Sequence, residues 1–353
     1  MDKYFLNKLL ETASVSGFET NAGNVFLNYL QPYVDSYSVD VMGNSYTYIE
    51  TSKLKEDSKK YLIEAHIDEI GFQVIYINDM GYVYIRRNGG VDVQCIPGSQ
   101  VIIQTSSGEE IAGIIGKKPI HLIHPDEKGK SIELENLWID TGLSPDEVKE
   151  KISIGDVVAW KSNMLYLGQD RIASKGLDDK IGVFVVSQVM KRLSAIKKSC
   201  NTVYGVASVQ EEVGCRGAVI CGYAVNPDIA ISIDVDFATD VPNCPKQKFG
   251  EIGLGKGVII HRNLDNNIPL TYEIEKIAKD NNISFQISAR PLSTGGTNAN
   301  KIQLSRNGIK TLSLGIPCRY MHTPVEVCDF KDVDSSIELI CKIIELILSL
   351  IHI

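Results

Sequence analysis

The chain has 353 residues, enough for two domains or for one large domain with an insertion. Hydrophobic residues make up 44% and charged residues 23% of it, as is ordinary for a globular protein in water. The net charge of −8 and the pI near 5.4 argue against general nucleic-acid binding, which needs a basic patch.

The chain ends and the cysteines bear on its location. The first residues lack the apolar segment and small-residue cleavage site of a signal peptide. No stretch approaches a membrane span, and the apolar run 337–353, which charged residues interrupt, is predicted to be an amphipathic helix. The eight cysteines are scattered without a CxxC pair. We therefore expect reduced thiols in a cytoplasmic protein that does not bind membranes.

Residues 1–66 are predicted to combine helices and strands. Phe5, Leu9 and Leu10 fall on one face of a helix. The elements expected before His66 are helices over 2–12 and 20–30, a polar turn over 14–19, two strands within 36–49 and a strand over 60–64.

The character of the sequence changes after Phe72. Segments become short, rich in Val and Ile, and broken by Gly and Asn. We predict strands at 72–77, 82–86, 100–104 and 111–115, and one helix at 145–152. Ser144 is the expected N-cap of that helix. Several short strands at regular spacing favour a small β-barrel or sandwich, inserted over 73–162.

Alternation of helix and strand resumes after residue 163. The expected helices are 177–194, a start at 216–221, and 270–281; the expected strands are 200–209, 229–233, 284–288 and 309–314. This order is typical of an α/β fold with a mostly parallel sheet sandwiched by helices. The predicted architecture is an α/β domain over 1–72 and 163–353, interrupted by the β-rich insertion.

A His-x-Asp motif stands at the end of the strand that precedes the insertion. His66 could bind a metal through one ring nitrogen, while Asp68 accepts a hydrogen bond from the other and fixes the ring. A surface histidine beside an acidic loop would give the same pattern. The interpretation as a metal site therefore depends on whether the rest of the chain supplies further ligands.

Four later motifs supply what His66 would need. They are Asp178–Asp179 at a helix start, Glu211–Glu212 after an apolar strand, Asp234 at the end of a buried strand, and His322 beyond another strand. Each has an ordinary reading: helix capping, solvated acids, a loop aspartate and a core or surface histidine, respectively. The paired glutamates also allow one to bind metal while the other handles a proton.

Taken together, the five motifs favour a site with two metal ions. Each places His, Asp or Glu at a predicted strand end or helix start, the edge where α/β proteins carry their sites. Carboxylate with imidazole suits zinc, cobalt or manganese. The order His, Asp, Glu-Glu, Asp, His suits two ions that share one Asp. Such a pair polarises a carbonyl and holds a hydroxide, as in dinuclear aminopeptidases.

The motifs resemble those of a known family over nearly the whole chain. They are SVSGFE at 14–19, AHIDEIG at 65–71, GKKPIH at 116–121, LDDK at 177–180, QEEVG at 210–214, ATD at 238–240, GGT at 295–297 and RYMHTPVE at 319–326. The chain is similar to the dinuclear metallo-aminopeptidases that assemble into tetrahedral dodecamers, the glutamyl aminopeptidase-like or TET family. Some members of that family are labelled endoglucanases.

The resemblance implies a set of ligands for two divalent ions, zinc or cobalt. His66 and Asp234 would hold one ion, Glu212 and His322 would hold the other, and Asp178 would bridge both.

The resemblance also implies roles for residues that do not bind metal. Glu211 would be the general base that deprotonates the water between the ions and then protonates the leaving amine. Asp68 would orient His66, and the peptide bond between Asp178 and Asp179 would be cis. The family's insertion is a β-barrel that forms dimers, so a dimer-based tetrahedral dodecamer acting on short peptides is implied.

The sequence departs from the family pattern at three positions. Asn298 stands where Asp is usual, Lys180 where Arg is usual, and Gly176 where Ala is usual. None of them removes an implied ligand. His121 and His124 in the insertion are expected to be structural rather than ligands.

Two other functions remain open from the sequence. Paired carboxylates could cleave glycosides, but the 2 Trp residues leave little for a sugar platform and the histidines would have no role. A non-catalytic peptide-binding shell would not need Glu211. The preferred N-terminal residue, the native metal, and dimer versus dodecamer are not determined by the sequence.

Overall fold

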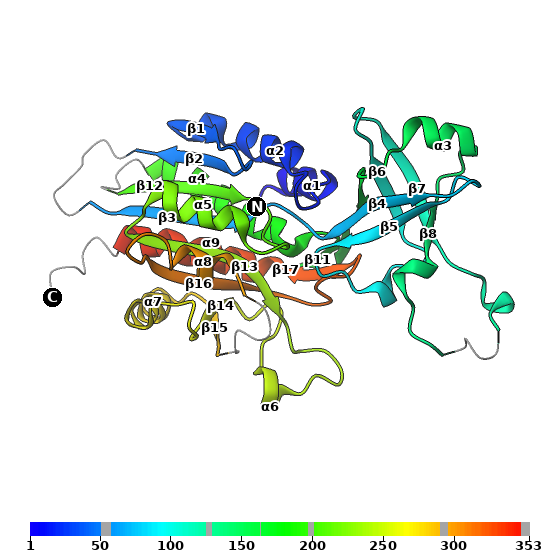
Figure 1. The fold of residues 1–353 in the computed structure, drawn as a ribbon. Helices are drawn as coiled ribbons and strands as arrows, with labels where there is room; N and C mark the ends of the chain where they lie inside the picture. Colours follow the sequence, from blue (N-terminus) through cyan, green and yellow to red (C-terminus); the bar gives the residue numbers. More distant parts are fainter. Residues whose placement is uncertain (51–57, 125–128, 163, 197–200, 290–295, 347–353) are drawn as a thin grey trace.

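The computed structural model describes residues 1–50, 58–124, 129–162, 164–196, 201–289 and 296–346. They form a large α/β unit and a closed six-stranded barrel that extends from one end of it (Figure 1). The predicted fold class, a sheet between helices with an inserted β-barrel, is confirmed.

The α/β unit is built on an eight-stranded mixed sheet. Its strands in spatial order are β1 (Ser36–Val39), β2 (Ser45–Ile49), β12 (Thr202–Ser208), β3 (Lys60–His66), β13 (Ile229–Phe237), β16 (Lys310–Cys318), β14 (Val258–His261) and β15 (Phe285–Ser288). The four central strands β12, β3, β13 and β16 are parallel. Antiparallel pairs occur where β2 joins β1 and β12, and where β14 joins β16.

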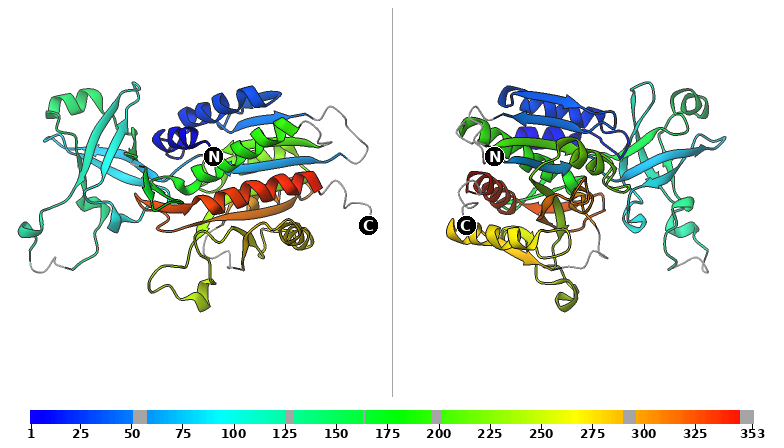
Figure 2. Two further views of the ribbon diagram at one scale, coloured as in Figure 1. Left: turned by 180° about the vertical axis from the view of Figure 1, so that it is seen from behind. Right: turned by 60° about the vertical axis from the view of Figure 1, so that its left-hand side comes forward.

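Helices cover both faces of this sheet, as the two views of Figure 2 show. On one face pack α1 (Lys3–Glu11), α2 (Thr20–Leu30), α4 (Leu177–Ile196), α7 (Ile268–Asp280) and α9 (Phe330–Leu346); on the other pack α5 (Arg216–Val225) and α8 (Asn298–Ile302). Side chains alternate along a strand, so Tyr61 and Ile63 of β3 enter the first core and Leu62 the second. Buried apolar residues on both faces therefore hold the carboxyl ends of the central strands in place.

The barrel is antiparallel and has its own core. Its strands are β4 (Gly71–Ile77), β5 (Val83–Asn88), β6 (Gln100–Gln104), β7 (Glu110–Gly116), β8 (Trp138–Asp140) and β9 (Val157–Trp160). Phe72, Ile103 and Ile139 are among the residues that fill it. The helix α3 (Pro145–Lys151) begins at the expected N-cap, where Ser144 and Glu147 form a reciprocal capping box.

The barrel is joined to the α/β unit at both ends. The strand β3 leads into β4 directly. After β9 the chain returns through β10 (Leu165–Leu167) and β11 (Arg171–Ser174), which form a three-stranded sheet with β17 (Glu326–Asp329). A short helix, α6 (Lys246–Phe249), lies in a long excursion after β13.

Several elements differ from the predicted ones. The C-terminal helix begins at Phe330 rather than at 337, and its predicted end, 347–353, lies outside the described residues. The predicted strand 200–209 is found as β12, and Cys200 lies outside the described residues. The strands β14 and β17 were not predicted, because each has only four residues and ends in a charged or titratable side chain.

Within the described ranges, no helix is both long and apolar enough to cross a membrane. Seven of the cysteines lie in these ranges, and all seven are free thiols.

Candidate metal centre

The predicted site residues come together at the carboxyl ends of the central strands. His66 is the last residue of β3, and Asp178 lies at the start of α4. Asp234 is the sixth of the nine residues of β13, which continues to Phe237 rather than ending before Asp234 as predicted. Glu212 follows β12, and His322 lies between β16 and β17. All five line one cavity of about 160 Å³.

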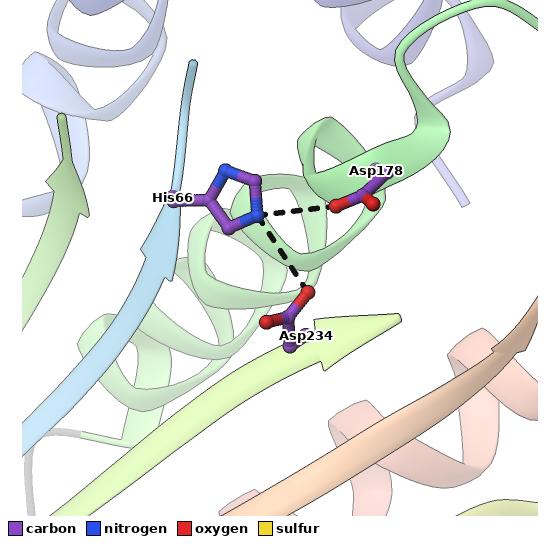
Figure 3. Close-up of side chains that lie close together, drawn as sticks. All are labelled: His66, Asp178 and Asp234. Atoms are coloured by element: carbon purple, nitrogen blue, oxygen red, sulfur yellow. Dashed lines mark ion pairs between the residues drawn. The ribbon is translucent and has the colours of Figure 1, made fainter. Parts of the chain in front are cut away.

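His66, Asp178 and Asp234 form the first group of potential ligands. Nε2 of His66 lies 3.1 Å from Oδ1 of Asp178 and 3.6 Å from Oδ1 of Asp234. Figure 3 shows that the three side chains converge from β3, α4 and β13. One ligand atom from each lies within 4.8 Å of the others, as a shared cation requires.

Asp178, Glu212 and His322 form the second group. Nε2 of His322 lies 3.4 Å from Oδ2 of Asp178 and 3.5 Å from Oε2 of Glu212. Asp178 thus presents one carboxylate oxygen to each group. Its peptide bond to Asp179 is cis, as the resemblance implied.

The chemistry of these donors fits divalent cations. Imidazole and carboxylate are ligands of zinc and cobalt, and Oε1 of Glu212 is a buried oxygen with no hydrogen-bond partner. Burial opposes charge on both imidazoles, but the contact with Asp178 outweighs burial and raises the pKa of His66 well above its usual value and that of His322 to about 10.

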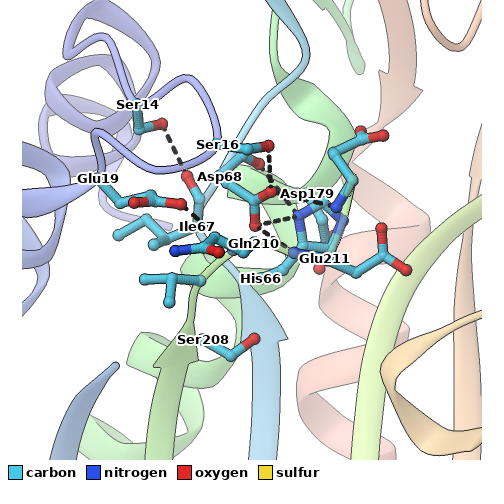
Figure 4. Close-up of polar contacts among 12 residues, drawn as sticks. Ser14, Ser16, Glu19, His66, Ile67, Asp68, Asp179, Ser208, Gln210 and Glu211 are labelled. Carbon is cyan, nitrogen blue, oxygen red and sulfur yellow. Dashed lines mark hydrogen bonds and ion pairs between the residues drawn. The ribbon is translucent and has the colours of Figure 1, made fainter. Parts of the chain in front are cut away.

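Asp68 connects the two sides of the site. Nδ1 of His66 lies 3.0 Å from the backbone carbonyl of Asp68 and 3.4 Å from its carboxylate. The carboxylate accepts hydrogen bonds from the backbone N–H groups of Glu211 and Glu212, at 3.0 and 3.1 Å, and from the hydroxyl of Ser16 (Figure 4). Asp68 therefore orients the histidine through its main chain and the glutamate pair through its side chain.

Glu326 is a positioning residue that the sequence did not single out. Its buried carboxylate accepts hydrogen bonds from the backbone N–H groups of Asp178, at 2.9 Å, and His322, at 3.1 Å. Glu326 is the last residue of the motif 319–326, and its presence in that motif could have marked it as a candidate site residue.

Glu211 lines the cavity without belonging to either ligand group. Burial raises the pKa of its carboxyl to about 8. The thiol of Cys215 donates to its Oε1 at 3.1 Å. A carboxylate that is near the ligands but not among them is suited to take up and release a proton.

The sequence profile described as M42 glutamyl aminopeptidase matches residues 45–339. The chain belongs to the M42 family. M42 proteins are peptidases, so this protein is a hydrolase of the peptidase class, and the predicted resemblance is confirmed.

Relatives and solved structures with the same architecture cover nearly the whole chain. A lysyl aminopeptidase of Pyrococcus furiosus is 32% identical over 98% of this chain and 97% of its own length. The TET aminopeptidase of a marine-sediment Thaumarchaeota archaeon is 32% identical, with a TM-score of 0.90 over 98% of this chain and 96% of its own. The Pyrococcus horikoshii TET1 peptidase, which can assemble into a tetrahedron or a large octahedral shell, is 29% identical, with a TM-score of 0.84 over 97% and 98% of the two chains. A Thermotoga maritima protein described as an endoglucanase is 28% identical, with a TM-score of 0.77 over 98% and 99%.

The three residues expected to depart from the family pattern lie beside buried carboxylates. Asn298 donates from Nδ2 to Oε1 of the buried Glu64 at 2.6 Å. Nζ of Lys180 lies 3.0 Å from Oε1 of Glu69, and a Cβ at Gly176 would overlap Oε2 of Glu69. None of the three belongs to either ligand group.

The two histidines of the insertion, His121 and His124, are exposed and belong to neither ligand group.

Proposed function

We propose that this protein is a metal-dependent aminopeptidase that removes N-terminal residues from short peptides. The observation that carries the proposal is the pair of ligand groups that share Asp178 in one cavity. The family membership and the named aminopeptidase relatives support the same activity.

Five residues would hold two divalent ions, zinc or cobalt. His66 and Asp234 would hold the first, Glu212 and His322 the second, and Asp178 both. When bound, such ions polarise a carbonyl and lower the pKa of a water molecule.

Glu211 would accept a proton from the attacking water and deliver it to the leaving amine. Its raised pKa, about 8, lets it bind and release a proton near neutral pH. Asp68 would hold Glu211 in position through the backbone hydrogen bond of 3.0 Å.

A glycoside hydrolase is the second candidate, because one similar structure is described as an endoglucanase. The cavity does not favour it. Phe237 is the one aromatic side chain among the described residues that line the cavity, whereas Trp160 is buried in the core of the barrel. Two imidazoles in the ligand groups also have no role in a two-carboxylate mechanism.

We further propose that the barrel is a dimerisation domain, over 73–162, of a dimer-based dodecamer. Several large apolar side chains are exposed on it: Ile75, Tyr76, Met80, Ile114, Ile120 and Leu122. The related TET1 peptidase assembles into closed shells. Light scattering should give a particle of twelve chains; a monomer at all concentrations would contradict this part of the proposal.

The activity is tested by hydrolysis of a panel of aminoacyl-4-nitroanilides. We expect turnover by the protein as purified, loss of turnover after removal of metal with a chelator, and recovery when zinc or cobalt is returned. Activity that survives a strong chelator on a glycan substrate would favour the glycoside hydrolase instead. Binding of peptides by the metal-loaded protein without any turnover would favour a non-catalytic shell.

A further inference from the structure

The cavity extends beyond the ligand groups into a region with acidic side chains. Three of the residues that line this outer region are Asp236, His261 and Asp265, from β13, β14 and the loop that follows β14. No Lys or Arg lines the cavity among the residues that the structure describes. The acidic side chains of the outer region are therefore not offset by a Lys or Arg that lines the cavity within the described part of the chain.

Asp265 is the most informative of these residues. Its side chain is 2% exposed, and its Oδ1 has no hydrogen-bond partner. Burial raises the pKa of its carboxyl because it removes hydration from the charged form. A buried carboxyl oxygen without a hydrogen-bond partner is costly, so a polar or charged ligand that enters the cavity is the expected partner of Oδ1.

The loop that carries Asp265 is firmly attached to the sheet. Asn266 donates to the carbonyl of His261 at 2.6 Å and accepts from the backbone N–H of Ser313 at 2.7 Å. Asn263 accepts from the N–H of Asp265 at 3.1 Å. The carboxyl is thus held against the cavity by rigid neighbours rather than presented on a loose segment.

Asp236 places a second carboxylate at a useful distance from the ligands. It lies two residues after Asp234 on β13, so both side chains are on the same face, about 7 Å apart along the strand. One of its oxygens accepts from the N–H of Phe237 at 2.7 Å, and the other lies 3.9 Å from Nε2 of His261. The spacing matches the reach of an extended, long side chain from the metal ligands.

We propose, building on the aminopeptidase function above, that this outer region binds the cationic side chain of an N-terminal lysine or arginine, with Asp265 and Asp236 determining that preference. The backbone of the N-terminal residue would be held at the ligand groups, and its ammonium or guanidinium would lie between the two carboxylates. A glutamyl side chain would meet two like charges in the same place.

The test compares lysyl- with norleucyl-4-nitroanilide, because norleucine has the same methylene chain without the ammonium. The protein is used full-length and loaded with zinc or cobalt. We expect kcat/KM for lysine to exceed that for norleucine at least tenfold, and Asp265→Asn and Asp236→Asn each to reduce this ratio roughly 10- to 100-fold, the range for hydrogen bonds to charged groups. Asp280→Asn, on the exposed end of α7, is the matched control and should keep the ratio.

A second readout separates binding from turnover. Calorimetric titration of Glu211→Gln should show tighter binding of the dipeptide Lys-Ala than of Nle-Ala. The double variant Glu211→Gln, Asp265→Asn should bind the two dipeptides equally well. A ratio near one, a preference for glutamyl substrates, or a preference that both aspartate variants retain would overturn the inference. If the metal-loaded protein cleaves no member of a broad panel, the aminopeptidase function itself fails, which is a different result from cleavage without preference.

Discussion

The carbonyl oxygen of Gly90 lies 2.9 Å from Nδ1 of His322, although 232 residues separate them. Gly90 follows β5 of the barrel, and His322 follows β16 of the α/β unit. The imidazole therefore takes the orientation of its metal-facing nitrogen from the barrel. The N–H of Asp92 also donates to the carbonyl of His322 at 3.2 Å, so the contact is reciprocal. The insertion thus contributes directly to the proposed second metal position.

Gly90→Ala should weaken that position. A Cβ at Gly90 would lie 2.7 Å from Nδ1 of His322, which forces the ring to move. We expect the metal affinity of the position that includes His322 to fall about 10- to 100-fold, and kcat to fall by a similar factor, as for other changes to residues that hold a metal ligand in place. Titration with cobalt, monitored by the absorption spectrum of the bound ion, measures the affinity of both positions. Two unchanged binding steps would show that the contact does not orient the ligand.

Asp68→Ala should impair metal binding and turnover together, because the carboxylate holds the backbone of both Glu211 and Glu212. We expect a loss of about 10- to 100-fold in kcat and in affinity. Ser16→Ala is the control, since it removes one of the hydrogen bonds to that carboxylate and leaves the others. Equal effects of the two substitutions on kcat would contradict the assigned role.

Gly176→Ala should destabilise the fold, although the resemblance implies that Ala is the usual residue at this position. Gly176 has φ +62°, and its Cβ would overlap Glu69, which Lys175 holds at 2.7 Å. We expect the free energy of unfolding to fall by about 2–4 kcal/mol, from left-handed strain of about 1–2 kcal/mol and the overlap. Gly17→Ala, at φ +92° with open space around its Cβ, should lose the strain energy alone. Denaturant titrations that give equal losses would exclude the overlap.

Metal binding should strengthen as the pH rises. The pKa of His322 is raised to about 10 and that of His66 well above its usual value, so both imidazoles are protonated at neutral pH and must lose protons to bind metal. We expect up to about a tenfold gain in affinity per pH unit for each proton released. Calorimetry in buffers of different ionisation enthalpy counts these protons. Binding without proton release between pH 6 and 8 would contradict the assignment.

The same shift predicts how the metal-free protein depends on pH. Because the pKa of His322 is higher in the folded state, its contribution to stability is fully present below about 6.5 and is lost as the pH rises through about 10. Thermal unfolding of metal-free protein, compared with His322→Gln, should show a pH dependence that the variant lacks in this window. A parallel dependence in both proteins would assign the effect to other groups.

Much of the site could be predicted because its chemistry is tied to local sequence. His66 ends the apolar strand β3, Asp234 follows the apolar first part of β13, and the parallel pairing of β3 and β13 brings the two residues to one edge of the sheet. The two Glu residues after β12 follow the same rule. Periodicity and residue type are local properties, and they were enough to place five acidic or histidine motifs together and to separate the barrel from the α/β unit.

The missing parts depend on contacts between distant segments. Nothing local to Gly90 indicates that its carbonyl contacts His322. The motif 319–326 includes Glu326, but it does not indicate that Glu326 accepts a hydrogen bond from the distant Asp178. Asp265 could not be predicted either, since its proposed role depends on the position of the loop after β14, a strand too short to predict. The ligand and catalytic roles of the predicted residues stay predictions until metal is bound.

Glu211→Gln tests the central claim most directly. The account predicts that the variant binds two zinc or cobalt ions per chain with affinity close to that of the wild type, because Glu211 belongs to neither ligand group. It also predicts a loss of at least about a hundredfold in kcat on aminoacyl-4-nitroanilides, because the proton carrier is gone. Glu150→Gln, on the exposed face of α3, should match the wild type in both measurements. Retained turnover with two ions bound, or loss of one ion together with turnover, would contradict the role given to Glu211.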